Sequence, residues 1–594
     1  MILGSNSGSH ARLNATARGW WRRIRPYRWR LLALVSCQLG QVAASLLLPA
    51  LSADVVDEGI VAGKPDVIVH YSVLMGVAAI VQVVLSASAV IVGATVAYRV
   101  GWDLRSEVFA KVHALAATQV RSFTVDSLIT RCTNDVLQVQ TMLTMALTMI
   151  IIAPIIGVGA AVMAVRQDAQ LSLLLLVVVP ILAAIIATLT FRATPLFRRM
   201  QKQIDRVNAV LREQISGIRV IRAFLQQRRE AARFATANTN LTHTATAAGR
   251  LMSMIAPTVM MIVQLTSVAL IWVGSSRVPS GDLQVGTLIA FLSYVALILI
   301  SVMMMGMLIV MLPRALVSGQ RIGELLRVPV ALAPPASPTP LPAADRGPSL
   351  RFETVSFGYP GAEAMVLETV SFDVGPGQVL GIIGATGSGK STIVNLIPRL
   401  DDPSEGRVTL GGVDLRALSP ETLSAHIGYV PQTSYLLSGT VAETLSLGKP
   451  EASEDDLWHA LEIAQAADFV EALPDRLRAP VSQGGSNFSG GQRQRLAIAR
   501  ALVCRSSIYV FDDSFSALDQ ATDGRLRVAL RRDLKDAALV IVSQRAVSIR
   551  DADTILVLDK GRVVGRGRHE VLMHGCPVYA DIVTSQQSHE GLAV

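Results

Sequence analysis

Eight consecutive residues of this chain have the types and spacing of a phosphate-binding loop: Gly384, Ala385, Thr386, Gly387, Ser388, Gly389, Lys390 and Ser391. Glycines let the backbone wrap closely, so that successive N–H groups and the following helix N-terminus point at phosphate oxygens. The lysine would reach the β- and γ-phosphates, and the Ser391 hydroxyl would bind Mg²⁺. An apolar stretch at 379–383 predicts a strand before the loop, and 392–397, beginning with Thr392, predicts a helix after it. This setting favours nucleotide binding over the simpler alternative, a glycine-rich turn before a helix.

Two further residues could complete a nucleotide site. Tyr359 follows a strand-like segment and could stack on an adenine ring, because an aromatic face tolerates any base. The apolar run 508–511 closes on Asp512, and a carboxylate at the end of such a strand is a common Mg²⁺ ligand beside a nucleotide. These residues therefore predict a bound nucleotide with Mg²⁺.

The composition divides the chain into two halves that would position these residues. The chain has 594 residues, of which 51% are hydrophobic and only 17% charged, and its mean hydropathy is +0.45. The long uncharged runs all lie before about residue 315, and ordinary globular alternation follows. A membrane half followed by a soluble half is the simplest explanation, because one core cannot accommodate so long a chain.

Six runs in the first half are near the ~20 residues needed to cross a bilayer. They lie at about 31–52, 68–98, 140–165, 169–191, 251–274 and 284–312. The connections after the first, third and fifth runs carry few basic residues, whereas 99–139 and 192–250 are long and arginine-rich. The positive-inside rule therefore places these two segments and both termini in the cytoplasm, in a multi-pass protein of the cell membrane.

The second cytoplasmic segment contains a candidate docking element. Apolar residues recur there at helical spacing, and a glycine precedes Ile218, Ile221 and Phe224, which would share one face. A plain amphipathic helix is the alternative interpretation. A proline-rich stretch, 329–348, marks a linker between a transmembrane domain at 1–328 and a soluble domain at 349–594.

Several function classes are disfavoured by what the six runs contain. No Asp, Glu, Lys or Arg lies inside them, so an ion-coupled carrier with a buried proton relay is disfavoured. The net charge of +9 gathers beside the membrane runs, which argues against nucleic-acid binding. The four cysteines are scattered without a C-x-x-C, so neither a disulfide framework nor a zinc site is predicted. No cleavable signal peptide is visible.

An ordered set of motifs in the soluble half resembles the nucleotide-binding domain of ATP-binding cassette (ABC) transporters. Besides the phosphate loop, the set comprises 426–432, 487–492, 508–513 and 516–519. From about residue 20 to 585 the chain resembles the half-transporter exporters of that family. The implied fold is a polytopic α-helical membrane domain of exporter type with six helices, fused to an α/β P-loop domain. The implied activity is ATP-driven transport.

The resemblance implies a role for each motif. Tyr359 stacks on adenine, and Gln432 is the Q-loop residue that joins Ser391 and Asp512 in binding Mg²⁺. The signature motif, which completes a partner's ATP site, comprises Phe488, Ser489, Gly490, Gly491 and Gln492. The D-loop comprises Ser516, Ala517, Leu518 and Asp519. The coupling segment that docks on a cassette contains Glu213, Gly217, Ile221, Arg222 and Phe224.

Two positions in the expected catalytic set, Gln432, Asp513 and Gln544, depart from the family pattern. The family has Glu after the Walker B Asp, where this chain has Asp513, whose carboxylate is one methylene shorter. The family's switch histidine is Gln544 here, which can donate a hydrogen bond but cannot carry positive charge. Gln483 stands where a glutamate is common shortly before the signature. The combination resembles the degenerate-site subunit of heterodimeric bacterial exporters, and it predicts ATP binding with impaired hydrolysis at this chain's own site.

The expected protein is one subunit of a heterodimeric exporter of amphiphilic drugs or lipids, with a second half-transporter as partner and membrane lipid around it. Three alternatives remain open at this point. They are a slow homodimeric exporter, a lipid or fatty-acid importer on the exporter fold, and an ATP-gated channel or regulatory protein. Substrate identity and the residues lining a substrate cavity do not follow from the sequence.

Overall fold

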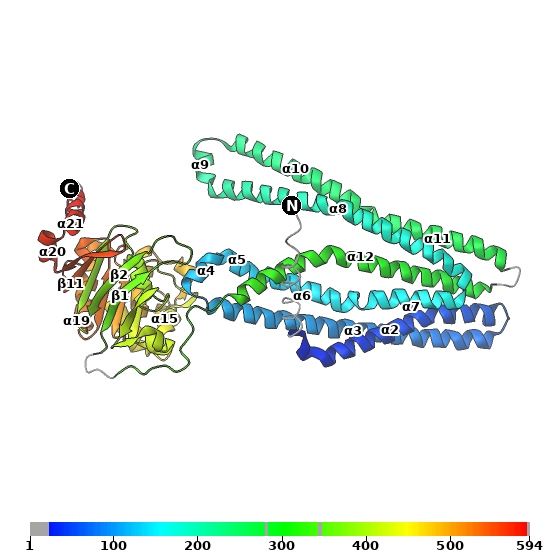
Figure 1. The fold of residues 1–594 in the computed structure, drawn as a ribbon, viewed down its shortest axis with the longest axis horizontal. Coiled ribbons are helices and arrows are strands. Elements are labelled where there is room, and N and C mark those ends of the chain that lie inside the picture. The colour runs from blue at the N-terminus through cyan, green and yellow to red at the C-terminus, as the bar shows by residue number, and fades with distance from the viewer. Residues whose placement is uncertain (1–22, 279–282, 343–346, 591–594) are drawn as a thin grey trace. The chain divides into compact units, whose positions relative to one another are not determined.

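The structure, a computed structural model, describes residues 23–278, 283–342 and 347–590 and divides the chain into two compact units (Figure 1). The first unit contains the chain up to His113 and Asp126–Val328. The second contains Ala114–Val125 and the chain from Pro329 onwards. In the described residues the first unit is helical and without strands, and the second is an α/β unit, so the predicted fold class is confirmed.

Long helices make up the first unit because its apolar runs are uninterrupted by charges. Its helices are α2 (Arg28–Asp54), α3 (Pro65–His113), α5 (Val125–Thr130), α6 (Val136–Met145), α7 (Ile152–Gln167), α8 (Ala169–Ser216), α9 (Ile218–Ala223), α10 (Gln227–Ser253), α11 (Ile255–Arg277) and α12 (Val285–Arg327). Within the described residues, six helical stretches have the length and apolar composition to cross a bilayer: Arg25–Ile60, Pro65–His113, Val125–Gln167, Ala169–Ser216, Gln227–Ser275 and Val285–Met305. The six predicted spans are thus present as helices.

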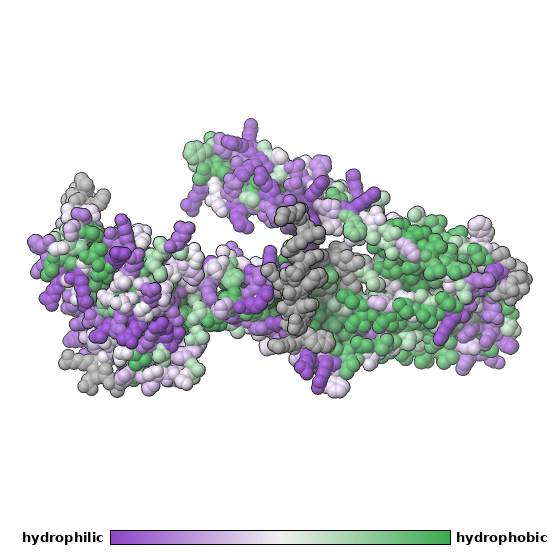
Figure 2. Space-filling model, viewed as in Figure 1, coloured by the Kyte–Doolittle hydropathy of each residue, from purple (hydrophilic) through white to green (hydrophobic). Residues whose placement is uncertain are grey.

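The core of the helical unit is apolar with a few polar groups that donate hydrogen bonds to backbone carbonyls. Phe291 and Tyr294 on α12 are fully buried, and the Tyr294 hydroxyl donates to the Leu46 carbonyl at 2.9 Å. The buried Gln38 Nε2 donates to the Leu147 carbonyl at 2.7 Å. Such bonds satisfy polar groups that would be costly to leave unpaired in this setting. Figure 2 shows hydrophobic surface along these helices and, around α9, hydrophilic side chains interspersed with hydrophobic ones.

A six-stranded sheet organises the second unit, with strand order β12-β11-β3-β10-β9-β6. All neighbours are parallel except β12, which is antiparallel to β11. The strands are β3 (Val379–Gly384), β6 (Ile427–Val430), β9 (Ile508–Asp512), β10 (Ala538–Val542), β11 (Thr554–Asp559) and β12 (Arg562–Gly567). Side chains along one strand alternate between two apolar cores: Leu380 and Ile382 enter one, and Val379 and Ile383 the other. Burial on both faces is typical of parallel sheets.

The remaining elements cover the two faces of this sheet. A four-stranded antiparallel sheet has the order β2-β1-β4-β5, and β7 pairs with β8. Their bounds are β1 (Leu350–Phe357), β2 (Leu367–Val374), β4 (Glu405–Leu410), β5 (Val413–Asp414), β7 (Gly439–Thr440) and β8 (Pro480–Val481). The helices are α4 (Ala117–Phe123), α13 (Lys390–Leu396), α14 (Pro420–His426), α15 (Val441–Leu445), α16 (Glu454–Ile463), α17 (Ala467–Glu471), α18 (Gly490–Val503), α19 (Gln520–Asp533), α20 (His569–Gly575) and α21 (Pro577–Glu590).

Candidate functional site

Four loops meet at the carboxyl edge of the six-stranded sheet. Strands β6, β9, β10 and β3 are parallel neighbours, and register pairs Val542 of β10 with both Ile382 of β3 and Asp512 of β9. The four loops that follow these strands carry the phosphate-loop residues, Gln432, Asp513 and Gln544. Ligands of open α/β sheets bind beyond this edge, because the loops converge there.

The phosphate loop is a tight cradle built by its glycines. Gly387 and Gly389 have φ of +84° and +101°, a region that disfavours other residues. A Cβ on Gly384 would lie 2.2 Å from the Leu558 carbonyl oxygen, so the loop fits closely against the neighbouring strand. Gly389 directly precedes α13, so the N-terminus of that helix opens into the cradle. The backbone therefore has the shape expected for an anion site.

Lys390 lies inside its own loop. Its side chain is buried, and Nζ donates to the carbonyls of Gly384 at 2.7 Å and Ala385 at 2.8 Å. Burial lowers the pKa of this ammonium group, and the carboxylates of Asp513 and Asp512 oppose that effect. The cation is thus held close to both carboxylates, and an anion entering the cradle would approach it directly.

Asp512 ends β9 as a desolvated carboxylate. Only 7% of its surface is exposed, and burial, followed by the charge of Asp513, raises its pKa to about 6. The ammonium of Lys390 acts in the opposite direction. A carboxylate held in this way gains most from a bound cation, because a cation would replace the hydration that burial removed.

Asp513 is the point at which the three predicted catalytic residues meet. Its backbone has φ of +44°, and its N–H donates to the Val542 carbonyl at 2.9 Å, which ties it to β10. Gln432 Nε2 donates to Asp513 Oδ2, and the Gln544 backbone N–H donates to Oδ1, both at 3.5 Å. Both distances lie beyond the usual range for such bonds, so the short carboxylate only just reaches its neighbours.

Tyr359 stands beside the helix that follows the phosphate loop. Its hydroxyl lies 3.2 Å from the hydroxyl of Thr392, and its ring meets Phe357 edge to face with a centroid distance of 5.0 Å. The ring is half-buried, and these two contacts hold it next to the phosphate loop. Its stacking on adenine stays a prediction.

The signature residues form the start of α18. Ser489 caps the helix: its hydroxyl accepts the Gln492 N–H at 3.3 Å, and Gln492 Oε1 accepts the Ser489 N–H at 2.9 Å. Phe488 is buried and packs on Phe469, whereas Ser489 and Gly490 are exposed. The capping box thus fixes the helix start while leaving its first residues accessible.

The D-loop residues lie beside this helix start. A Cβ on Gly491 would lie 3.4 Å from the Ala517 carbonyl, which shows how closely the two segments approach. Leu518 is buried, and Ser516 Oγ donates to the Asp513 carbonyl at 2.8 Å. Asp519 caps α19 by accepting the Thr522 N–H at 2.9 Å, and this hydrogen bonding lowers the pKa of Asp519. The D-loop therefore connects Asp513 to the signature helix.

The predicted coupling residues lie around a sharp turn between α8 and α9. Glu213 Oε2 accepts a hydrogen bond from Arg233 of α10 at 2.7 Å, and this contact lowers the Glu213 pKa. Gly217 separates the helices, and its N–H donates to the Glu213 carbonyl at 2.8 Å. Arg222 is exposed, Ile221 is half-buried, and Phe224 is 71% exposed. The turn presents an apolar surface that this unit does not cover, and its docking role stays a prediction.

Sequence reasoning missed a second contact element, α4 in the first cytoplasmic segment. This helix belongs to the same compact unit as the sheet, and Thr118 Oγ1 donates to the buried Asp401 Oδ1 at 2.8 Å. Gln119 Nε2 donates to the Pro329 carbonyl at 2.9 Å. Burial raises the Asp401 pKa, and the Thr118 hydrogen bond opposes this. A seven-residue helix has almost no periodicity to detect, and Thr118 is 283 residues from its partner.

The residues at the sheet edge fit ATP with Mg²⁺. The cradle and Lys390 suit phosphates, while the exposed hydroxyl of Ser391 and the buried Asp512 offer oxygen ligands for a hard cation, with Gln432 nearby. When bound, Mg²⁺ would neutralise charge on the phosphates and orient them. In the part of the chain that the structure describes, no three His, Cys, Asp or Glu side chains form a metal site by themselves.

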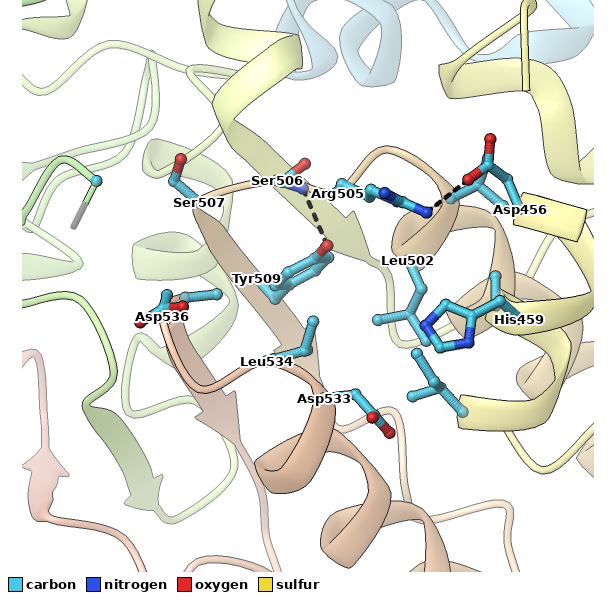
Figure 3. A pocket seen from close by; sticks show the side chains of 15 residues that line it. Asp456, His459, Leu502, Arg505, Ser506, Ser507, Tyr509, Asp533, Leu534 and Asp536 are labelled. Carbon is cyan, nitrogen blue, oxygen red and sulfur yellow. Dashed lines mark hydrogen bonds and ion pairs between the residues drawn. The ribbon is translucent and has the colours of Figure 1, made fainter. Parts of the chain in front are cut away.

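A cavity of about 480 Å³ lies away from these loops (Figure 3). It is lined by Ser506 and Ser507 before β9, by Asp536 before β10, and by His459 of α16. It therefore lies at the amino ends of strands whose carboxyl ends carry the phosphate-site loops. Two of its charged groups, Arg505 and Asp456, pair with each other at 2.6 Å. None of the predicted site residues lines it.

Comparisons with known proteins agree with this geometry. Residues 31–303 match the family described as ABC transporter transmembrane region, and residues 367–516 match the family described as ABC transporter. An uncharacterized ABC transporter ATP-binding protein of Mycobacterium tuberculosis is 44% identical over 95% of this chain and 97% of its own length.

Two relatives with named substrates and one solved structure are also similar. An ATP-dependent lipid A-core flippase of Chromobacterium violaceum is 29% identical over 96% of this chain and 97% of its own length. A fatty acid ABC transporter ATP-binding/permease protein of Mycobacterium bovis is 31% identical over 80% of this chain and 75% of its own length. The structure of a bacterial Atm1-family ABC exporter with ATP bound aligns with a TM-score of 0.78 and 26% identity, covering 94% of this chain and 98% of that one.

Proposed function

The chain belongs to the ABC transporter family as an exporter-type half-transporter, and from that premise we propose that it is the degenerate-site subunit of a heterodimeric exporter. It is a multi-pass membrane protein with a cytoplasmic nucleotide-binding domain, and it works by ATP-driven transport. The observation that carries the finer proposal is the constellation of Asp513, Gln432 and Gln544.

Slow hydrolysis at this chain's own nucleotide site, the weak site of the pair, follows from the chemistry of these three residues. A general base must be within hydrogen-bond reach of the attacking water, and a displacement of about 1 Å can cost 100-fold in rate. The Asp513 carboxylate is shorter than the family's glutamate and meets both neighbours only at 3.5 Å. Gln544 cannot supply the charge of a protonated histidine. The site keeps Lys390 and Asp512, so it binds nucleotide but turns it over slowly.

The partner's nucleotide site would be the working site, at which ATP is hydrolysed, and the intact signature motif of this chain would complete it. Cassettes of this family pair head to tail, so the exposed start of α18 at Ser489 and Gly490 would face the partner's nucleotide. We expect the partner to have Glu and His at the positions that match Asp513 and Gln544. ATP binding would close the pair, and hydrolysis at the partner's site would reset it.

Closure would reach the membrane through two cytoplasmic elements. We propose that the apolar surface at Ile218, Ile221 and Phe224 docks on a nucleotide-binding domain, as the resemblance implies. Support comes from its exposure, which is costly unless a partner covers it. The α4 contact between Thr118 and Asp401 would provide the second connection.

A lipid-like or other amphiphilic substrate fits the membrane domain best. The six spans contain no acidic or basic residue to bind an ion or sugar. The two relatives with named substrates are a lipid A-core flippase and a fatty acid transporter. The second name keeps fatty-acid uptake on the exporter fold as an alternative, which direction-resolved transport in vesicles would distinguish.

The testing experiment is ATP turnover of the purified, lipid-reconstituted chain, alone and together with a co-expressed second half-transporter. We expect little turnover from the chain alone and at least about a tenfold rise in the pair, because general-base catalysis contributes that much or more. Full activity of the chain alone would contradict the proposal, since Asp513 and Gln544 would then suffice in a homodimer.

The acidity of Asp512 gives a pH prediction for its nucleotide site. Its pKa of about 6 means that the carboxylate is ionised above and protonated below this pH. Cation binding needs the ionised form, so apparent Mg²⁺ affinity should be constant above pH 6 and fall about tenfold per pH unit below it. Mg²⁺ titration of a fluorescent nucleotide between pH 5 and 7.5 measures this. The variant Asp512→Asn serves as control for titration of the phosphates themselves. Identical profiles in both proteins would contradict the assignment.

A further inference from the structure

The C-terminal helix α21 contacts the loop that carries Gln544. The Gln586 side chain bridges two backbone groups of that loop: Nε2 donates to the Gln544 carbonyl at 2.7 Å, and Oε1 accepts the Ala546 N–H at 2.8 Å. Both bonds have good lengths, and together they use the donor and the acceptor of one amide. No other residue type of this length offers one donor and one acceptor in this arrangement.

The helix that carries Gln586 is itself anchored in the domain. Tyr579 is fully buried and its hydroxyl lies 2.8 Å from His569 Nδ1, while Val583 is 4% exposed. Residues at 579, 583 and 586 follow at spacings of four and three, so they share one face of α21. The buried face therefore fixes the direction in which the glutamine amide points. Figure 1 shows α21 as the last helix of the second unit.

The bridged loop leads directly to Asp513. The Gln544 N–H donates to Asp513 Oδ1 at 3.5 Å, while the carbonyl of the same residue accepts from Gln586. Within the loop, the buried Ser543 hydroxyl accepts the Arg545 N–H at 2.9 Å. A chain of hydrogen bonds therefore joins α21 to the carboxylate through the backbone of the switch residue.

We propose that Gln586 is a positioning residue that clamps the switch loop, the segment 543–546 after β10. Through this clamp α21 would restrict the motion of Gln544 beside the bound nucleotide. This inference rests on the proposed function, which places Gln544 at the nucleotide. The clamp acts on backbone groups, so it holds the loop whatever side chain occupies position 544.

Hydrogen exchange in the full-length reconstituted chain tests the clamp without relying on turnover. In Gln586→Ala the Ala546 N–H loses its acceptor, and exchange in a peptide covering 544–548 should become about 3- to 10-fold faster, as expected for one lost hydrogen bond. Gln586→Glu keeps an acceptor for Ala546 but sets a carboxylate against the Gln544 carbonyl. The Gln586→Glu variant should therefore keep the Ala546 amide protected from exchange and still lower the affinity for nucleotide. Ser585→Ala, at an exposed neighbouring position whose hydroxyl bonds only within α21, is the matched control.

Nucleotide affinity provides the second measurement. The Kd for a fluorescent ATP analogue should rise about 3- to 10-fold in Gln586→Ala, while Ser585→Ala stays within about twofold. In the assembled pair, kcat should not change, because the partner's site carries out the hydrolysis. Unchanged exchange in Gln586→Ala would overturn the clamp. Faster exchange with unchanged affinity would overturn its link to the nucleotide. If the wild type bound no nucleotide, the proposed function would fail, and exchange would still decide the clamp.

Discussion

Replacing Gly490 with aspartate is expected to lower ATP turnover of the assembled transporter by about 100-fold or more, the scale of losing preorganised donors around a transferring group. Gly490 is the first residue of α18 and is exposed. In the proposed pair it faces the partner's nucleotide, so a carboxylate there would repel phosphate. Turnover of the reconstituted pair, at saturating ATP, measures the effect.

The same substitution should leave this chain folded. A Cβ at position 490 would meet no atom within 4 Å, and an acidic residue in the first helical turn is favourable. Gly490→Ala adds the carbon without the charge and controls for bulk. Asp513→Ala is the decisive comparison: in the proposed pair hydrolysis occurs at the partner's site, so turnover should stay within about twofold. Losing the partner's equivalent glutamate should nearly abolish it. Equal losses from Gly490→Asp and Asp513→Ala would refute the division into weak and working sites.

Local sequence patterns were sufficient for the architecture. The expected strand, loop and helix around Lys390 are confirmed as β3, the cradle and α13, because a buried strand and the glycines each have a distinct local signal. The six membrane runs are equally local, since length and lack of charge define them. Helices α8 and α10 extend beyond the apolar runs, as the helical spacing in 192–250 predicts.

Contacts between residues far apart along the chain could not be predicted from local sequence patterns. Gln432 and Asp513 are 81 residues apart, and only the register of β6 on β9 brings their loops together. Their roles came from resemblance rather than from spacing. No sequence motif marks the contact of Thr118 with Asp401 or that of Gln586 with Gln544. A single polar residue on a short helix cannot be distinguished from any solvent-facing position. The pKa of Asp512 likewise depends on burial that only the folded sheet creates.

The backbone at Asp513 gives a physical reason for its short side chain. Its φ of +44° lies in the left-handed region, which aspartate tolerates better than longer residues. A glutamate there would carry about 1 kcal/mol of additional strain. Backbone stability at this position therefore favours the shorter acid, and in the proposed pair the partner's site would carry out the hydrolysis.

Restoring the family residues should reverse that loss. The double variant Asp513→Glu with Gln544→His is expected to raise ATP turnover of the chain alone by about tenfold or more, because a general base within reach contributes 100- to 10,000-fold. The extra methylene lengthens the reach of a carboxylate whose present contacts are 3.5 Å long, and the histidine can hold a positive charge. Steady-state turnover of the reconstituted double variant, without a partner, measures the gain.

Each single variant isolates one contribution. If the two residues act as a unit, Gln544→His alone should raise ATP turnover little, because the carboxylate of Asp513 would still be too short to reach the attacking water. Asp513→Glu alone should recover only part of the increase in turnover. Nucleotide affinity should stay within about threefold, since the phosphate loop is untouched and only contacts beside it change. Thermal unfolding of each variant separates strain at position 513 from failed catalysis. A stable double variant that binds ATP as tightly as the wild type but hydrolyses it no faster would show that the defect lies elsewhere. The assignment of Asp513 and Gln544 as the cause would then be wrong.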